Sequence, residues 1–135
     1  MKCLVTGGAG FIGSNLVDEL IKRGHQVVII DNLSTGKREN INPKALFYEV
    51  DIESPNAAEA FNGVDVVFHT AAHARVQPSI EDPISFNKTN VEGTLNMLKM
   101  AADNGVTRFV YSASSSAYGS TDKLPQQESD PTDPL

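Results

Sequence analysis

The sequence predicts an α/β fold in which a doubly wound parallel sheet is covered by helices on both faces. Short apolar runs alternate with helix-patterned segments along the chain, which is the order of βα units. The run at residues 26–30 is apolar almost without interruption, as in strands that are buried on both faces. The first run is followed directly by a glycine-rich turn at residues 7–13. Right-handed crossovers predict the strand order 3-2-1-4-5, with a ligand crevice between strands 1 and 4.

Composition limits the classes of function. At 135 residues the chain is long enough for one domain with its own core. Its net charge of −6 argues against sequence-independent nucleic-acid binding, which needs a positive face. No run approaches the about 18 apolar residues of a membrane span, and the apolar start is too short for a signal peptide. We therefore expect no nucleic-acid partner, no membrane contact and a cytoplasmic location.

The elements follow from hydrophobic period and from turn residues. We expect strands at residues 2–6, 26–30, 45–50, 64–69 and 107–112, and helices at residues 10–23, 55–61 and 83–104. Residues 32–43 are polar and predict a loop or a short helix. The apolar period of the last helix is carried by Val91, Leu95, Leu98 and Ala102.

The glycine turn is the strongest functional signal. Gly7, Gly10 and Gly13 stand between the first strand and the first helix. Glycine at this place lets the backbone approach a pyrophosphate, and the helix N-terminus that follows favours an anion. These residues predict a dinucleotide site.

An acid after the second strand favours NAD. Asp31 lies about 20 residues past the glycines, where a carboxylate accepts hydrogen bonds from the ribose hydroxyls of NAD. A 2′-phosphate would meet its negative charge, so we expect NAD rather than NADP. A basic pair nearby, Lys37 and Arg38, is the feature that could instead hold a 2′-phosphate. Ala71 and Ala72, after the fourth strand, would leave room beside the cofactor.

The glycine spacing resembles that of a known superfamily. G-x-x-G-x-x-G resembles the short-chain dehydrogenases/reductases, and Thr-Gly-Gly-Ala-Gly-Phe-Ile-Gly at residues 6–13 resembles their extended branch of NAD-dependent epimerases and dehydratases, which have a Rossmann-like fold. The resemblance implies that Asp51 takes the adenine amine and that Ile52 packs on the ring. From the sequence alone, Asp51 suits the start of a helix equally well. Asn90 matches the family's Asn-Val-x-Gly-Thr and would support the active-site strand. The implied cofactor residues are Gly7, Gly10, Phe11, Ile12, Gly13, Asp31, Asn32, Asp51, Ile52, Ala71, Ala72 and Asn90.

A serine run at the end of the predicted fifth strand is the candidate catalytic segment. From spacing alone, it is equally well a polar loop. However, residues 112–119, Ser-Ala-Ser-Ser-Ser-Ala-Tyr-Gly, resemble a segment of the UDP-galactose 4-epimerases. This alignment implies that Ser114 takes the catalytic Ser/Thr position and that Ser115 and Ser116 lie beside the sugar. Residues 76–83 resemble epimerases of UDP-N-acetylated or UDP-uronate sugars, which adds Val76 as a substrate residue. The implied activity is transient oxidation at C4 of a nucleotide sugar by bound NAD, followed by return of the hydride.

Two other functions stay open. Nucleotide-sugar dehydratases and decarboxylases carry acids where this chain has Ser115 and Ser116, so a fragment of such an enzyme is the less favoured reading. A non-catalytic NAD(H)-binding module is another alternative, against which the retained Ser114 argues. We expect no metal site, because His69 and His73 have no cysteine or carboxylate cluster at ligand spacing.

The family's Tyr-x-x-x-Lys pair is absent from the sequence. We therefore expect residues 1–119 to be an NAD-binding domain and residues 120–135 to be a proline-rich tail that leads toward a missing catalytic helix. On this reading the chain is a truncated piece of a longer enzyme that lacks the C-terminal strands and the substrate domain. It would be inactive alone, and the nucleotide sugar would be a partner of the longer parent. The apolar surface left bare on the helix at residues 83–104 leaves a homo-oligomer open.

Overall fold

The computed structural model describes residues 1–120 and 123–134. Five parallel strands form one sheet in the order β3-β2-β1-β4-β5, as predicted from the sequence. The strands are β1 (Lys2–Thr6), β2 (Gln26–Asp31), β3 (Leu46–Glu49), β4 (Val66–His69) and β5 (Arg108–Tyr111). Because β1 pairs with both β2 and β4, the strand order reverses there, and a crevice opens at the carboxyl ends of these strands.

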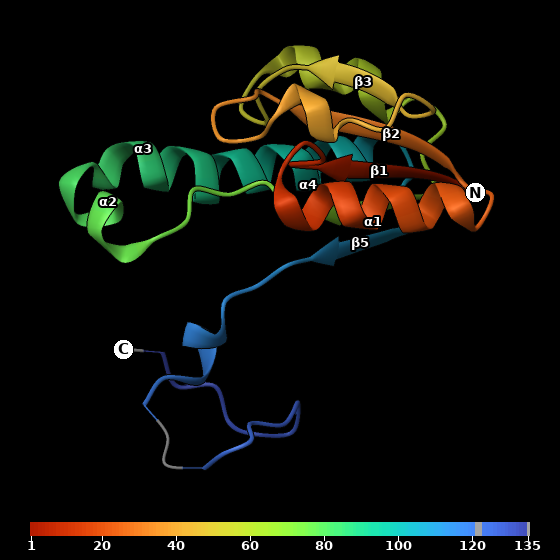
Figure 1. Cartoon of the computed structure of the whole chain (residues 1–135). Helices are drawn as coiled ribbons and strands as arrows, with labels where there is room; N and C mark the ends of the chain where they lie inside the picture. The colour runs from red at the N-terminus through yellow and green to blue at the C-terminus, as the bar shows by residue number, and fades with distance from the viewer. Residues whose placement is uncertain (121–122, 135) are drawn as a thin grey trace.

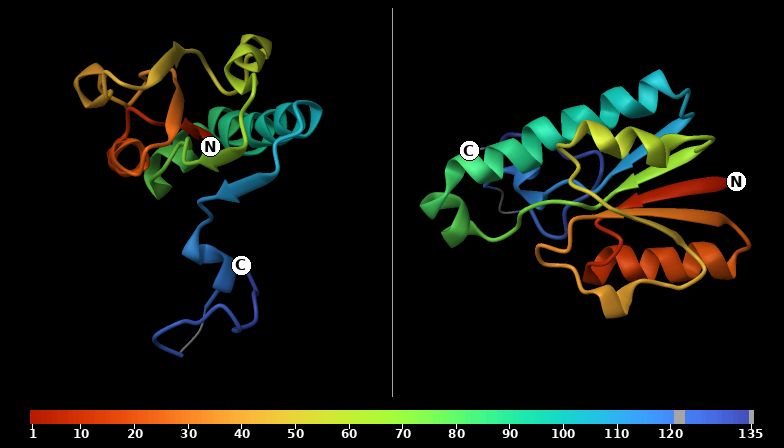
Figure 2. Two further views of the ribbon diagram at one scale, coloured as in Figure 1. Left: turned by 90° about the vertical axis from the view of Figure 1, so that its right-hand side faces the viewer. Right: turned by 90° about the horizontal axis from the view of Figure 1, so that it is seen from above.

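Helices cover the two faces of the sheet (Figure 1). α1 (Phe11–Lys22) packs on one face; α4 (Thr94–Asp103) and a 3₁₀ helix (Pro55–Phe61) pack on the other. The view from above in Figure 2 shows the α4 side and the α1 side separated by the strands. The sheet is therefore the middle of three layers.

Side chains of the central strands alternate between two cores. Leu4 belongs to the cluster on the α4 side, whereas Cys3 and Val5 belong to the cluster on the α1 side. All three are at most 1% exposed. This burial on both faces is the reason that the central strands are apolar without interruption.

The long helix predicted at residues 83–104 is present as one continuous rod, residues 83–103, whose helix type changes along its length. α3 (Pro83–Asn87) continues through a π-helical stretch (Lys88–Gly93) into α4. Asp82 caps the start of the rod by accepting a hydrogen bond from the Ser85 N–H. A short helix that the sequence did not predict, α2 (Val76–Glu81), precedes it. The short helix predicted at residues 55–61 is confirmed with the same bounds and is of the 3₁₀ type. The polar segment at residues 32–43 holds one short 3₁₀ turn (Arg38–Asn40).

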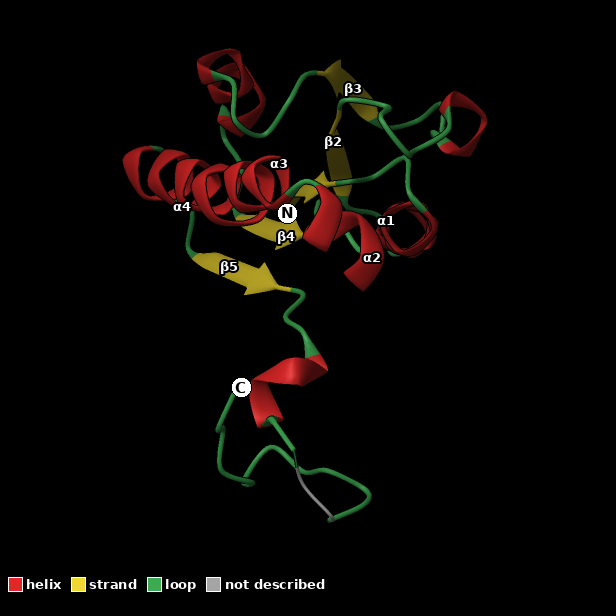
Figure 3. Cartoon of the chain, turned by 90° about the vertical axis from the view of Figure 1, so that its left-hand side faces the viewer, coloured by secondary structure: helices red, strands yellow, loops and turns green. Residues whose placement is uncertain are grey.

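The apolar stripe predicted on the last helix lies outside the core and lines an open hollow beside Phe109 and Tyr111 of β5. Val91, Leu95 and Leu98 are 58%, 65% and 44% exposed, and the core contacts come instead from Met97 and Met100. The bare apolar surface expected on this helix is therefore present in the described chain. Beyond β5 the chain leaves the sheet (Figure 3).

Phe61 anchors the 3₁₀ helix in the core, where it is fully buried. We predict that Phe61→Ala lowers the free energy of unfolding by about 3–5 kcal/mol, because the truncation leaves a cavity. Phe11→Ala, at a side chain that is 84% exposed, is the matched control and should change it by less than about 1 kcal/mol. Equal losses in urea denaturation would contradict this picture of the core.

Candidate functional site

A cavity of about 320 Å³ lies at the carboxyl ends of β1, β2 and β4. It is the crevice predicted from the strand order. Every predicted cofactor residue except Asn90 lines it. The lining residues are Gly7, Gly10, Phe11, Ile12, Gly13, Ile30, Asp31, Asn32, Ser34, Thr35, Gly36, Val50, Asp51, Ile52, Thr70, Ala71, Ala72, His73 and Thr89.

The glycine turn requires glycine at two of its positions. Gly7 has a φ of +72°, and a Cβ there would lie 2.9 Å from the Ala71 Cα. A Cβ at Gly13 would lie 2.1 Å from the Gly7 carbonyl oxygen. A side chain at either position would push the turn away from β4 or from the start of α1. The sequence therefore builds a floor of bare backbone for the crevice.

The N-terminus of α1 opens into this floor. Gly10 is the N-cap residue and provides no side-chain cap, so the amide N–H groups of the first turn have no side-chain acceptor. Phe11 and Ile12 are 84% and 66% exposed and line the cavity. Uncapped first-turn amides and the positive end of the helix dipole favour an anion at this point. The residues present therefore fit a pyrophosphate group.

Asp31 ties β2 to the glycine turn. Its Oδ2 accepts a hydrogen bond from the Ala9 N–H at 2.9 Å, and its Oδ1 accepts one from the Leu33 N–H at 2.8 Å. Asp31 is only 8% exposed, yet it lines the cavity. Each carboxylate oxygen can accept a second hydrogen bond, so Asp31 can hold the turn and also receive ribose hydroxyls.

The basic pair beside Asp31 is engaged elsewhere. Arg38 forms an ion pair with Glu49 and lies 5.7 Å from the centroid of the Phe47 ring. Lys37 lies 3.5 Å from a carboxylate oxygen of Glu39. Neither basic residue lines the cavity. Their observed contacts give no support to a 2′-phosphate site.

The opposite wall of the crevice is formed by the residues after β3. The Asn32 Nδ2 donates to Asp51 Oδ2 at 2.8 Å, which joins the loop after β2 to the loop after β3. Ile52 is 5% exposed and contributes an apolar surface to the cavity. A carboxylate beside an aliphatic side chain is the pair that the resemblance implies for an adenine ring.

A buried histidine connects the glycine turn to the helical rod. The Thr6 Oγ1 accepts the N–H groups of Thr70 and Ala71, both at 3.2 Å, so its own hydroxyl donates to His69 Nδ1 at 2.7 Å. The proton of the neutral ring must therefore be on Nε2, which donates to Thr94 Oγ1 at 2.9 Å. Donor counting thus assigns one tautomer to His69. Burial, which disfavours the charged form, lowers the pKa of His69 to about 4.

Asn90 supports the crevice from behind rather than lining it. The Thr94 hydroxyl donates to the Asn90 carbonyl oxygen at 2.8 Å. The Asn90 side chain in turn accepts the His73 N–H at 2.8 Å and donates to the His73 carbonyl at 2.9 Å. This double hydrogen bond fixes the small-residue loop in which Ala72 lies. The predicted role of Asn90 as a cofactor contact stays a prediction.

The predicted catalytic and substrate residues lie outside the cavity. Ser114 is exposed, and its Oγ accepts the Ser116 N–H at 3.1 Å. Ser115 begins a short 3₁₀ turn (Ser115–Tyr118). Val76 is 75% exposed at the start of α2. The structure does not bring these residues together with the crevice, and their roles stay predictions.

Several lining residues were not predicted as site residues. Gly36 is the clearest, because a Cβ there would lie 2.9 Å from Asp31 Oδ1 and 2.9 Å from the Ala9 Cβ. A glycine in the polar loop after the Asp31 strand was the available signal. Thr89 lies 37 residues beyond Ile52 in the sequence, and no local pattern indicates that it reaches the crevice.

The described residues also bear on membrane spans and metal sites. Within residues 1–120 and 123–134, no helix is long and apolar enough to cross a membrane. In the same described part of the chain, no group of three or more His, Cys, Asp or Glu residues could hold a metal ion.

Comparison with known proteins decides the family. The NAD dependent epimerase/dehydratase family matches residues 3–135. The chain belongs to this family. Among solved epimerases, UDP-glucose 4-epimerase from Thermotoga maritima with UDP-glucose matches with a TM-score of 0.91 and 44% identity, over 100% of this chain and 45% of that chain. The Thermus thermophilus UDP-glucose 4-epimerase complex with NAD matches with a TM-score of 0.88 and 39% identity, over 99% and 45%.

Curated relatives include two activities of the family. UDP-glucose 4-epimerase from Lactobacillus helveticus is 40% identical over 100% of this chain and 42% of its own length. UDP-glucuronic acid decarboxylase 1 from Arabidopsis thaliana is 41% identical over 95% of this chain and 29% of its own length. This epimerase/dehydratase chain therefore spans less than half the length of these relatives.

We predict a pH dependence of stability that His69 controls. Its pKa is about 4 in the folded chain and about 6.5 unfolded. The unfolded state therefore binds more protons between these pH values. The free energy of unfolding should accordingly fall by about 3 kcal/mol as the pH drops from 6.5 to 4.

Variants isolate this contribution. In His69→Gln, the part of the loss in unfolding free energy that comes from protonation of the imidazole should vanish. His25→Gln, outside this hydrogen-bonded chain, should keep it. Denaturation curves at pH 7, 5.5 and 4.5 would measure the difference, and an equal slope in wild type and His69→Gln would contradict the assignment.

Proposed function

We propose that this chain is the NAD-binding part of a nucleotide-sugar 4-epimerase. The main support is that three features line one crevice. They are the uncapped N-terminus of α1, the carboxylate of Asp31, and the pair Asp51 and Ile52. A pyrophosphate, an adenosine ribose and an adenine ring need these three kinds of surface. Related epimerases that share this fold are solved with NAD and with UDP-glucose, which supports both the cofactor and the substrate class.

The chain's own residues would bind and orient the cofactor. The first-turn amides of α1 would donate to the pyrophosphate, and Asp31 would accept the ribose hydroxyls through its remaining lone pairs. The small side chains of Ala71 and Ala72 would let the nicotinamide half approach β4. Bound NAD⁺ supplies a reversible hydride acceptor, which is what inversion at C4 of a sugar needs.

Ser114 would hydrogen-bond the sugar oxygen at C4 in the proposed enzyme. Ser115 and Ser116 take the positions where dehydratases and decarboxylases carry acids, which favours epimerisation. The second candidate, a decarboxylase part, is favoured by the relative from Arabidopsis thaliana and disfavoured by these serines. Because the sequence has no Tyr-x-x-x-Lys pair, we propose that the chain alone does not convert UDP-sugars.

NADH and NADPH titrations test the cofactor assignment. The chain should bind NADH at least about tenfold more tightly than NADPH, because a 2′-phosphate would face the Asp31 carboxylate. In Asp31→Asn this preference should shrink. Asp18→Asn makes the same change of net charge on α1, away from the crevice, and should keep it. Calorimetry would measure all six affinities, and NADPH bound as tightly as NADH by the wild type would refute the assignment.

A further inference from the structure

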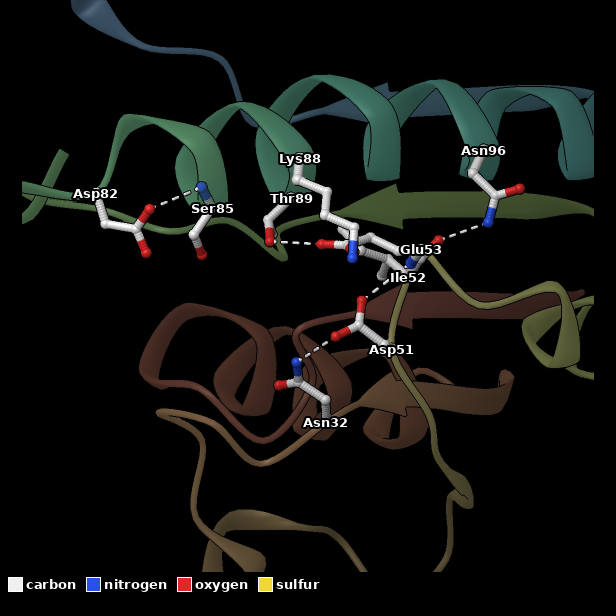
Figure 4. A network of polar contacts seen from close by, with 9 residues as sticks. All are labelled: Asn32, Asp51, Ile52, Glu53, Asp82, Ser85, Lys88, Thr89 and Asn96. Atoms are coloured by element: carbon white, nitrogen blue, oxygen red, sulfur yellow. Dashed lines mark hydrogen bonds and ion pairs between the residues drawn. The ribbon is translucent and has the colours of Figure 1, made fainter.

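The segment at residues 51–53 forms the adenine-side wall of the crevice. It leaves β3 and carries two cavity-lining residues, Asp51 and Ile52. Figure 4 shows that it lies directly beneath the helical rod that runs from α3 to α4. A free loop would make this wall mobile, so its attachments decide how well the wall is formed before a ligand arrives.

The helical rod holds this segment at two of its residues. The Thr89 hydroxyl donates to Glu53 Oε1 at 2.8 Å, and the Lys88 ammonium lies 2.8 Å from Glu53 Oε2. About two turns further on, the Asn96 Nδ2 donates to the Ile52 carbonyl at 2.7 Å. The Glu53 side chain is 18% exposed, so its carboxylate is committed to these partners. We call Glu53, Lys88, Thr89 and Asn96 the clasp.

Between these contacts the rod offers bare backbone to Ile52. A Cβ at Gly93 would lie 2.7 Å from the Ile52 Cδ1. Thr89, Gly93 and Asn96 are spaced by four and three residues, the spacing of neighbours on one helix face. Thr89 and Gly93 of this face belong to the π-helical stretch Lys88–Gly93. One face of the rod is therefore built to receive the segment.

The clasp also determines where the Asp51 carboxylate points. Its Oδ1 accepts the Glu53 N–H at 2.9 Å, and its Oδ2 accepts from Asn32 at 2.8 Å. Holding Glu53 therefore holds the acid that precedes it. The hydrogen bond to Glu53 raises the pKa of Lys88, so the Lys88 ammonium stays charged across the physiological range.

We propose that Glu53, Lys88 and Asn96 are positioning residues that hold Asp51 and Ile52 in place for the adenine half of the dinucleotide. These three do not line the cavity, so they act through the segment at residues 51–53. The proposal rests on the proposed function for the nature of the ligand. It assigns a specific binding role to a network that would otherwise only join two elements.

The chain offers matched variants for the test. Lys88→Met and Asn96→Ala release the segment. Lys99→Met removes an ion pair with Asp103 at 2.7 Å on the same rod, and makes the same change of net charge as Lys88→Met. Asn104→Ala removes a side-chain hydrogen bond to the Met100 carbonyl at 2.8 Å. The two controls lose contacts of the same kind, one ion pair and one side-chain hydrogen bond to a carbonyl, that do not touch the segment.

Ligands that differ in their adenine half give the readout. NADH, ADP-ribose and reduced nicotinamide mononucleotide, which lacks the adenosine half, are titrated by calorimetry. Lys88→Met and Asn96→Ala should each weaken NADH and ADP-ribose by about tenfold and leave the mononucleotide unchanged. The two controls should bind all three ligands as the wild type does.

Affinities of the clasp variants equal to those of the wild type, or an equal loss for the mononucleotide, would overturn the proposal. Failure of the wild type to bind NADH and ADP-ribose would overturn the proposed function instead. The clasp is then judged by hydrogen exchange in the ligand-free chain at the Glu53 and Ser54 amides. Faster exchange there in Lys88→Met and Asn96→Ala, but not in the controls, supports the clasp, and unchanged exchange refutes it.

Discussion

The structure depends on one constraint, the hold of the Asp31 carboxylate on the glycine turn. The backbone between β1 and α1 must be bare enough to receive a phosphate and yet have a defined shape. Close packing of Gly13 on the Gly7 carbonyl makes the turn tight, and the hydrogen bond from Ala9 to Asp31 fixes it to β2. The same carboxylate lines the crevice, so one side chain both supports the turn and places a negative charge beside the proposed dinucleotide site.

Two polar connections hold the crevice, and both reach the helical rod on one face of the sheet. On the β4 side, neutral His69 connects Thr6 to Thr94. On the β3 side, Glu53 and Ile52 connect to the helical rod. Each connection joins a residue at or just beyond a strand end beside the crevice to the helical rod. The rod therefore acts as a common support for the β4 side and the β3 side of the crevice.

The sequence predicts the parts of this site that depend on neighbouring residues. Strand order, the glycine turn and Asp31 follow from local period and spacing, because backbone geometry is set within a few residues. The contacts of His69 with Thr94 and of Glu53 with Thr89 join residues 25 and 36 positions apart, so no local pattern contains them. The helical period likewise predicted one long helix at residues 83–104. It could not show which side of this helix is buried, because Val91 and Met97 are both apolar, yet Val91 is exposed and Met97 is buried. Ser114 lies exposed in the described chain, and its catalytic role stays a prediction.

An NADH titration of the ¹⁵N-labelled chain, followed by amide NMR, tests the central claim most directly. The account predicts that the amide signals of Phe11, Ile12 and Gly13 shift with ligand, together with those of Asp31 and Ile52. Signals at the opposite ends of the strands, such as Cys3 and Val27, should not shift. Shifts confined to residues outside the crevice, or no shifts at millimolar NADH, would contradict it.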